Sequence, residues 1–282
     1  MARTRLIRLG LLLWCSALLF ARAALAASPK LEVVSEEPVS VFGGGKRTVR
    51  IQFRNPTAAS IEATLRWRLF QATSSTLAPT GDERPWHAVS LRPTQALLEN
   101  LEVELPEVRA ASLFHIVWFD GDDKIGATLL RVFPENLLRR LTTLAGDTPV
   151  GLVDPEGRFT NALGRLRYES LSEAEHVAAT GARLILIAPF GPAHHVAGLA
   201  NALKAKAASG AAVVWAQAPN PRSAELLPST YLLEAGGSRV VITSAQTLSD
   251  LADSPRAQIH LLRMAELATG KVTLAWPGDT PP

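Results

Sequence analysis

Two histidines and two carboxylates are the side chains of this sequence with the clearest capacity for chemistry. His194 and His195 are adjacent, and Asp154 and Glu156 stand earlier in the same half of the chain. An imidazole beside a carboxylate can pass a proton or hold a metal ion. Neighbouring residues on a helix point about 100° apart, so two adjacent imidazoles do not easily face one ion. The alternative is a polar helix start at the histidines and a turn at Asp154–Gly157 that caps the next helix.

These residues fall where the strands of a predicted parallel sheet would end. Ligands of open parallel sheets bind outside the carboxyl ends of the strands. We therefore expect a crevice there that binds a ligand, with no residue assigned to catalysis and none to a metal. The candidate ligand-binding residues are Asp154, Glu156, Phe190, His194, His195, Gln217 and Asn220.

The sequence lacks the residues that several kinds of catalysis require. The only cysteine, Cys15, lies in an expected N-terminal leader, residues 1–26, so thiol catalysis and metal–thiolate sites are not expected of the mature chain. The sequence holds no Gly-x-Ser-x-Gly nucleophile elbow and no glycine-rich phosphate loop. Asp120–Asp123 lacks the later glutamate of a calcium loop and favours a hairpin turn. We expect no cofactor.

The first residues have the order of a secretory signal peptide. Three arginines precede an apolar run, Leu9–Phe20, and small residues stand at both ends of the triplet Ala24–Ala26. We expect a signal peptide over 1–26, cleaved after Ala26, and a periplasmic or secreted mature protein. The apolar run is about twelve residues, against the roughly twenty that span a bilayer, so an uncleaved membrane anchor is the alternative.

Charge argues against nucleic acid as a partner. The leader holds four arginines and no acidic residue, so its removal takes the 29 basic residues of the chain below its 26 acidic ones. No basic run is longer than two residues, whereas a phosphate-binding surface needs clustered cations. Without cysteines for disulfides, the mature chain must be held together by its hydrophobic core, and its length suits two domains.

Residues 28–133 alternate between apolar and polar side chains. Val49–Phe53, Ile61–Leu69 and Leu101–Leu105 repeat with a period of two, which buries one face of each strand. Turn-forming residues separate these stretches and no helical stretch intervenes, so the region is predicted to be an all-β sandwich of about seven strands. It resembles the immunoglobulin and fibronectin type III superfamily, with Trp67 placed like a core tryptophan and without the paired cysteines of antibody domains.

The pattern changes in the second half of the chain. We predict a partly helical connection over 134–148, an α/β domain over 149–276 and a loose tail over 277–282. Apolar strands alternate there with alanine- and leucine-rich helices, the clearest at 192–208 and 255–269. This order implies a parallel sheet covered on both faces. The predicted fold class is an all-β immunoglobulin-like sandwich followed by a three-layer, parallel-sheet domain of the flavodoxin/amidotransferase-like type.

The order of elements in the first half of that α/β domain resembles the class I glutamine amidotransferase-like fold. Pro149–Asp154 is similar to its first strand, Ala182–Pro189 to the strand that enters a Gly/Pro loop, and Ala211–Gln217 to the strand before the nucleophile elbow. The resemblance implies a glycine-flanked cysteine at Ala216–Asn220, where this chain has neither. His260 lies inside a predicted helix and does not match the family's catalytic histidine. The resemblance therefore implies a catalytically degenerate domain.

The sequence favours an exported, non-catalytic binding or assembly protein of the cell envelope. Its partner would be another envelope protein or a small ligand, and no permanent membrane span is expected after signal cleavage. The alternative is an exported hydrolase with a site around Asp154, His194 and His195. A third interpretation is a structural module of a larger envelope complex that docks through its N-terminal sheets.

Overall fold

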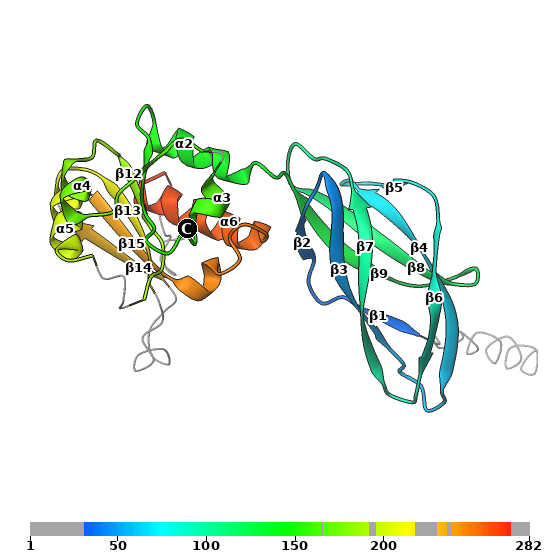
Figure 1. Cartoon of the computed structure of the whole chain (residues 1–282). Helices are drawn as coiled ribbons and strands as arrows, with labels where there is room; N and C mark the ends of the chain where they lie inside the picture. Colours follow the sequence, from blue (N-terminus) through cyan, green and yellow to red (C-terminus); the bar gives the residue numbers. More distant parts are fainter. Residues whose placement is uncertain (1–30, 165, 192–195, 218–229, 236–237, 272–282) are drawn as a thin grey trace, which may run out of the picture. The chain divides into compact units, whose positions relative to one another are not determined.

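The computed structural model describes residues 31–164, 166–191, 196–217, 230–235 and 238–271 (Figure 1). The chain divides into two compact units, and neither is one continuous segment. One unit runs to Val39 and includes Thr48–Glu102 and Leu113–Leu130, and the other holds Ser40–Arg47, Val103–Ser112 and everything from Arg131 onward. No helix in the described ranges is both long enough and apolar enough to cross a bilayer.

The N-terminal strands form two sheets. The strands are β1 (Glu32–Val34), β2 (Val39–Phe42), β3 (Gly45–Arg54), β4 (Ile61–Ala72), β5 (Leu77–Pro79), β6 (Arg84–Leu91), β7 (Ala96–Leu105), β8 (Ser112–Asp120) and β9 (Asp123–Phe133). One sheet has the order β1-β3-β7. The other has the order β2-β9-β8-β4-β5, and β6 also pairs with β4.

Alternation along β4 explains why this segment is a strand. Every second residue from Ile61 to Leu69 is buried, and the residues between them are exposed or half-buried. The ring of Phe53 on β3 meets that of Trp118 on β8 edge-on, with the ring centroids 5.0 Å apart, so the two sheets share one core. The indole N–H of Trp118 donates to Thr128 Oγ1 at 3.2 Å, which satisfies its polar atom inside that core.

One buried polar side chain fixes the loop after β3. Asn55 is fully buried, and its amide nitrogen donates to the carbonyls of Ala59 at 2.7 Å, Arg92 at 3.0 Å and Leu91 at 3.2 Å. Its amide oxygen accepts from the backbone N–H and the hydroxyl of Thr57, at 2.9 and 2.8 Å. One side chain therefore joins the loop after β3 to the end of β6.

The second half of the chain alternates strands with helices. Its strands are β10 (Val150–Val153), β11 (Tyr168–Ser170), β12 (Leu184–Ile187), β13 (Ala212–Gln217), β14 (Thr230–Ala235) and β15 (Ser238–Ser244). Its helices are α2 (Arg140–Ala145), α3 (Thr160–Leu163), α4 (Ala174–Ala179), α5 (Leu199–Ala208) and α6 (Pro255–Ala268), with short 3-10 turns η1 (Leu137–Arg139) and η3 (Ala245–Leu248). The sheet order is β11-β10-β12-β13-β15-β14.

Helices cover both faces of this sheet, with α4 and α5 on one side and α2, α3 and α6 on the other (Figure 1). Leu184 and Leu186 of β12 belong to the core beneath α2 and α6. Ile185 and Ile187 of the same strand belong to the core beneath α4 and α5. A strand buried on both faces needs a continuous apolar run, which is what β12 has.

The predicted fold class is wrong. The described residues form a mixed α/β structure with three sheets, 45% strand and 21% helix, and not an all-β immunoglobulin-like sandwich followed by a parallel-sheet, flavodoxin/amidotransferase-like domain. The N-terminal region has nine strands in unequal sheets, where about seven were expected. The C-terminal sheet is mixed and not all parallel. The pairs β11–β10, β10–β12, β12–β13 and β13–β15 are parallel, but β14 runs antiparallel to β15 with Ala235 opposite Ser238.

Residues 134–148, predicted as a connection, contribute side chains to the second core. β9 ends at Phe133, and η1 and α2 follow almost directly. Leu138, Leu141 and Ala145 are buried in the same core as α6. Arg140 on α2 also forms an ion pair with Glu266 on α6. This segment is therefore packed as part of the unit that contains the mixed sheet.

For the two helices that the sequence predicts most clearly, the predicted first residue agrees with the structure in one case and not in the other. α6 spans Pro255–Ala268, close to the predicted 255–269, and the side chain of Ser254 caps its start by accepting from the N–H of Ala257. α5 begins at Leu199, later than the predicted 192, after a left-handed Gly198. Residues 192–195 of the predicted helix lie outside the described residues.

Candidate functional site

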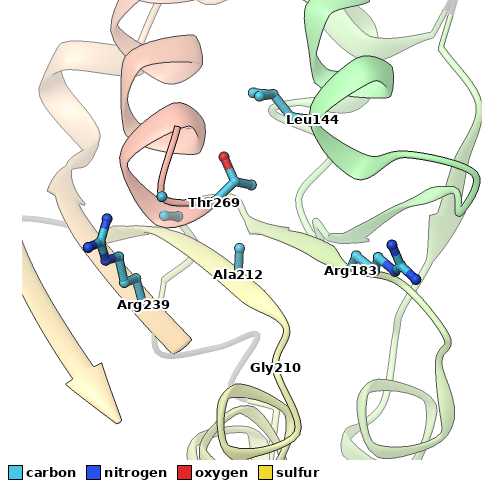
Figure 2. A pocket seen from close by; sticks show the side chains of 8 residues that line it. Leu144, Arg183, Gly210, Ala212, Arg239 and Thr269 are labelled. Carbon is cyan, nitrogen blue, oxygen red and sulfur yellow. The ribbon is translucent and has the colours of Figure 1, made fainter. Parts of the chain in front are cut away.

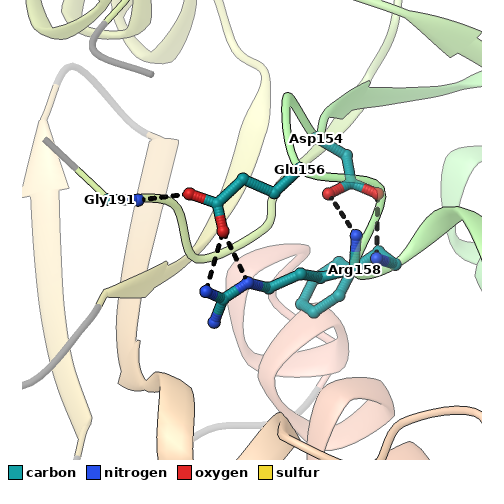
Figure 3. Close-up of polar contacts among 5 residues, drawn as sticks. Asp154, Glu156, Arg158 and Gly191 are labelled. Carbon is teal, nitrogen blue, oxygen red and sulfur yellow. Dashed lines mark hydrogen bonds and ion pairs between the residues drawn. The ribbon is translucent and has the colours of Figure 1, made fainter. Parts of the chain in front are cut away.

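Asp154 follows β10 and serves the backbone at the start of α3 (Figure 3). One carboxylate oxygen accepts from the N–H of Arg158 at 2.8 Å. The other accepts from the N–H groups of Phe159 and Thr160 and from the Thr160 hydroxyl, each at 2.8 Å. A carboxylate at this position caps orphan N–H groups and complements the positive end of a helical turn. The contacts match the capping alternative that the sequence left open.

Glu156 ties together two loops at the same edge of the sheet. One of its oxygens accepts from the backbone N–H of Gly191 at 2.6 Å, and the other accepts from Arg158 Nε at 2.9 Å and lies 2.7 Å from Arg158 Nη2 (Figure 3). The two loops follow β10 and β12, which are neighbouring parallel strands. Glu156 therefore positions the loops at the carboxyl edge.

Two further predicted site residues, Phe190 and Gln217, lie among the described residues. Phe190 packs against the core beneath α4 and α5, and Gln217 is exposed at the end of β13, opposite Ser244 of β15. The described residues contain no group of three or more His, Cys, Asp or Glu side chains that could hold a metal ion. The predicted site residues outside the described residues are His194, His195 and Asn220.

A histidine inside α6 makes a polar contact that the sequence did not suggest. His260 Nε2 lies 2.8 Å from Thr243 Oγ1 on β15, and Thr243 Oγ1 lies 3.3 Å from Thr230 Oγ1 on β14. A hydroxyl beside an imidazole is the geometry of an activated nucleophile. Thr243 is only 2% exposed, however, which withdraws its hydroxyl from a substrate. The contact therefore fixes α6 against the end of β15.

The environment of His260 predicts a pH dependence of folding. Burial, and secondarily the charge of Arg263, lowers the pKa of His260 below its ordinary value of 6.5. Below pH 6.5 the unfolded chain takes up a proton at this position before the folded chain does, so the free energy of unfolding should fall as the pH drops from 6.5 toward the folded-state pKa. We expect urea unfolding at pH 7.5, 6.5 and 5.5 to show this loss in the wild type and a shallower loss in His260→Gln.

The exposed His176 provides the matched control for this experiment. His176→Gln should leave the pH dependence as it is in the wild type. An equal slope for His260→Gln and the wild type would contradict the prediction.

A pocket lies at the opposite, amino-terminal edge of the mixed sheet (Figure 2). Its volume is about 390 Å³, and the described residues that line it include two arginines and no carboxylate. Arg183 directly precedes β12, and Arg239 lies at the start of β15, on either side of Ala212 of β13 (Figure 2). Leu144 of α2 and Thr269 at the end of α6 also line the pocket.

Sequence reasoning missed this pocket because nothing in the sequence marks Arg183 and Arg239 as a pair. Each arginine stands beside an apolar run that forms a strand of the sheet. This position next to a strand is the sequence feature that could have drawn attention to the two arginines. The two become partners only through the strand order, in which β13 lies between β12 and β15. The predicted site used the carboxyl ends of the strands, whereas the pocket uses their amino ends.

Comparisons with known proteins identify no family. No protein-family profile matches the sequence, and no curated protein matches it. Among solved structures, a β-glucosidase from Listeria innocua in complex with glucose is 14% identical with a TM-score of 0.26, covering 36% of this chain and 16% of that one. The alkylpurine DNA glycosylase AlkC of Pseudomonas fluorescens is 8% identical with a TM-score of 0.26, covering 38% of this chain and 31% of that one. The chain spans less than a third of either structure, and similarity this low assigns no function.

Proposed function

We propose that this chain is an exported, non-catalytic binding or assembly protein of the cell envelope. The observation that carries the proposal is the set of contacts made by the two candidate carboxylates. Asp154 accepts four hydrogen bonds from the start of α3, and Glu156 accepts from Gly191 and Arg158. Carboxylates held in this way organise loops, and an acid–base catalyst must instead reach a substrate proton.

The N-terminal sequence supports the export part of the proposal. The charged, apolar and small-residue order of residues 1–26 is that of a cleavable secretory signal. The binding part is supported by the pocket of about 390 Å³ at the amino-terminal edge of the mixed sheet, a volume within the range of small-molecule sites.

Expression of the full chain in a Gram-negative bacterium tests the proposal directly. We expect the protein in the periplasmic extract with an intact mass that begins at Ala27 or one residue later. A Leu12→Arg variant, which interrupts the apolar run of the leader, should remain unprocessed in the cytoplasm. A wild-type product that keeps residues 1–26 in the cytoplasm would contradict export.

The processed protein should then turn over no glutamine, ester or peptide substrate. Its mature sequence offers no thiol nucleophile, so any glutamine hydrolysis should be absent both with and without thiol-blocking reagents. Turnover that persists through purification and disappears in Asp154→Asn, with the fold retained, would replace this proposal by the hydrolase alternative.

A further inference from the structure

Arg239 carries a buried hydrogen-bond donor that lacks an acceptor among the described residues. Its Nη1 atom is buried and has no hydrogen-bond partner there. Its Nε donates to Glu234 Oε1 at 3.2 Å, but the Glu234 side chain is 65% exposed, so water screens most of that attraction. Buried donors in folded proteins are nearly always paired, so the guanidinium group of Arg239 lacks part of the hydrogen bonding that would hold it in place.

The end of α6 does not supply that acceptor. It lies beside Arg239, since a Cβ added to Gly270 would stand 3.5 Å from Nη1. Three carbonyls of the last helical turn, those of Ala265, Leu267 and Glu266, already accept from the backbone N–H groups of Thr269, Gly270 and Lys271. Capping of the helix C-terminus therefore leaves the position of Nη1 unexplained.

The surroundings of Arg239 suit an anion with an apolar body. Arg183 is exposed on the other side of Ala212 and adds a second positive charge (Figure 2). Leu144 and Ala212 supply apolar surface, and no atom lies within 4 Å of the position that a Cβ on Gly210 would take. The pocket thus combines two guanidinium groups, an apolar wall and open space.

We infer that this pocket binds a small organic anion, a carboxylate or phosphate on a short apolar body, whose acidic oxygens accept from the exposed part of the Arg239 guanidinium group. A guanidinium group is the side chain best matched to the oxygens of both anions. Arg183 raises the local positive potential across the pocket, and Leu144 and Ala212 contact the apolar body. The inference rests on the proposed binding function and names its ligand class.

Calorimetric titration of the purified chain tests this inference with two named probes, sodium butyrate and inorganic phosphate. The ionic strength is held constant with chloride, so that only specific binding changes between samples. We expect saturable 1:1 binding of at least one probe. Arg239→Gln should weaken that binding at least tenfold, and the charge reversal Arg183→Glu should weaken it several-fold.

The control Arg256→Glu makes the same charge change on the exposed first turn of α6, about 18 Å along the helix from the pocket. The affinity of this control variant for each probe should stay within twofold of the wild-type affinity. Circular dichroism checks the fold of each variant, and Arg183→Glu, which alters an exposed side chain, carries the test if Arg239→Gln unfolds.

Two outcomes would overturn the inference: no saturable binding of either probe, or affinities in both arginine variants equal to that of the control. Either result would leave the proposed function standing if the protein is exported and turns nothing over. Detected turnover or cytoplasmic retention would instead overturn the proposed function, even where anion binding is found.

Discussion

Replacing Asn55 by aspartate is expected to destabilise the N-terminal unit more than replacing it by alanine. The amide nitrogen of Asn55 donates to three carbonyls in a fully buried position. Asp has the same shape but would place a carboxylate oxygen against those carbonyls, adding a buried and repelled charge. We expect Asn55→Asp to lower the free energy of unfolding by about 3–5 kcal/mol, and Asn55→Ala by about 2–3 kcal/mol because it leaves the carbonyls unpaired.

Urea unfolding at pH 7, followed by tryptophan fluorescence, measures both changes. The exposed Asn100 on β7 gives the matched control, since Asn100→Asp makes the same chemical change in water. It should shift the free energy of unfolding by less than about 0.5 kcal/mol. Equal stability of Asn55→Asp and the wild type would show that the hydrogen bonds of this side chain are not formed as described.

Replacing Asp154 by alanine is expected to destabilise the unit that contains the mixed sheet. A single lost helix cap costs about 1 kcal/mol. Asp154 accepts four hydrogen bonds, three of them from backbone N–H groups that would lose their acceptor. We therefore expect Asp154→Ala to lower the free energy of unfolding by about 2–3 kcal/mol.

Asp154→Asn keeps one carbonyl oxygen but turns an NH₂ group toward a donor. It should therefore lower the free energy of unfolding measurably, but by less than Asp154→Ala does. Asp147→Ala removes an exposed carboxylate just before β10 and serves as the control, with a change of less than about 0.5 kcal/mol. Hydrogen exchange at Phe159 and Thr160 should accelerate in Asp154→Ala, and unchanged protection there would contradict the capping role.

Alternation in the sequence predicts strands well where one face is buried and the other is not. Ile61–Leu69 of β4 and Leu101–Leu105 of β7 follow their apolar–polar pattern residue by residue. The same pattern does not say which strands pair, and so it did not reveal how the nine strands divide between two unequal sheets. That division depends on contacts between distant segments, which periodicity does not encode.

The sequence did contain a signal for the antiparallel strand β14 at the edge of this sheet. Residues 230–235 and 238–244 are separated in the sequence by Gly236-Gly237 alone, a spacing typical of a two-residue hairpin. The prediction of a parallel sheet treated 240–243 as one more strand of an alternating series. The antiparallel pairing of β14 with β15 is the physical consequence of that short connection.

One part of the candidate site could be predicted from the sequence, and the pocket could not. The sequence identifies the polar residues after β10 and suggests a turn-and-cap role for Asp154, because an Asp at the end of a strand and before a helix has a local role. The pocket at Arg183 and Arg239 could not be found, since its two cations are brought together by strand order and by the end of α6.

The pairing of β4 with β8 also bears on how fast the chain folds. Leu65 lies opposite Asp120 and Ala72 opposite Leu113, so this ladder joins segments that are separated by three intervening strands and several loops. Such non-local pairing requires long loops to close, at an entropic cost, before the strands make favourable contacts. Proteins dominated by non-local pairing fold in roughly milliseconds to seconds. Slow folding lengthens the time for which a newly made chain can be threaded through a translocation channel. The topology of the N-terminal sheets would thereby help the export that we propose.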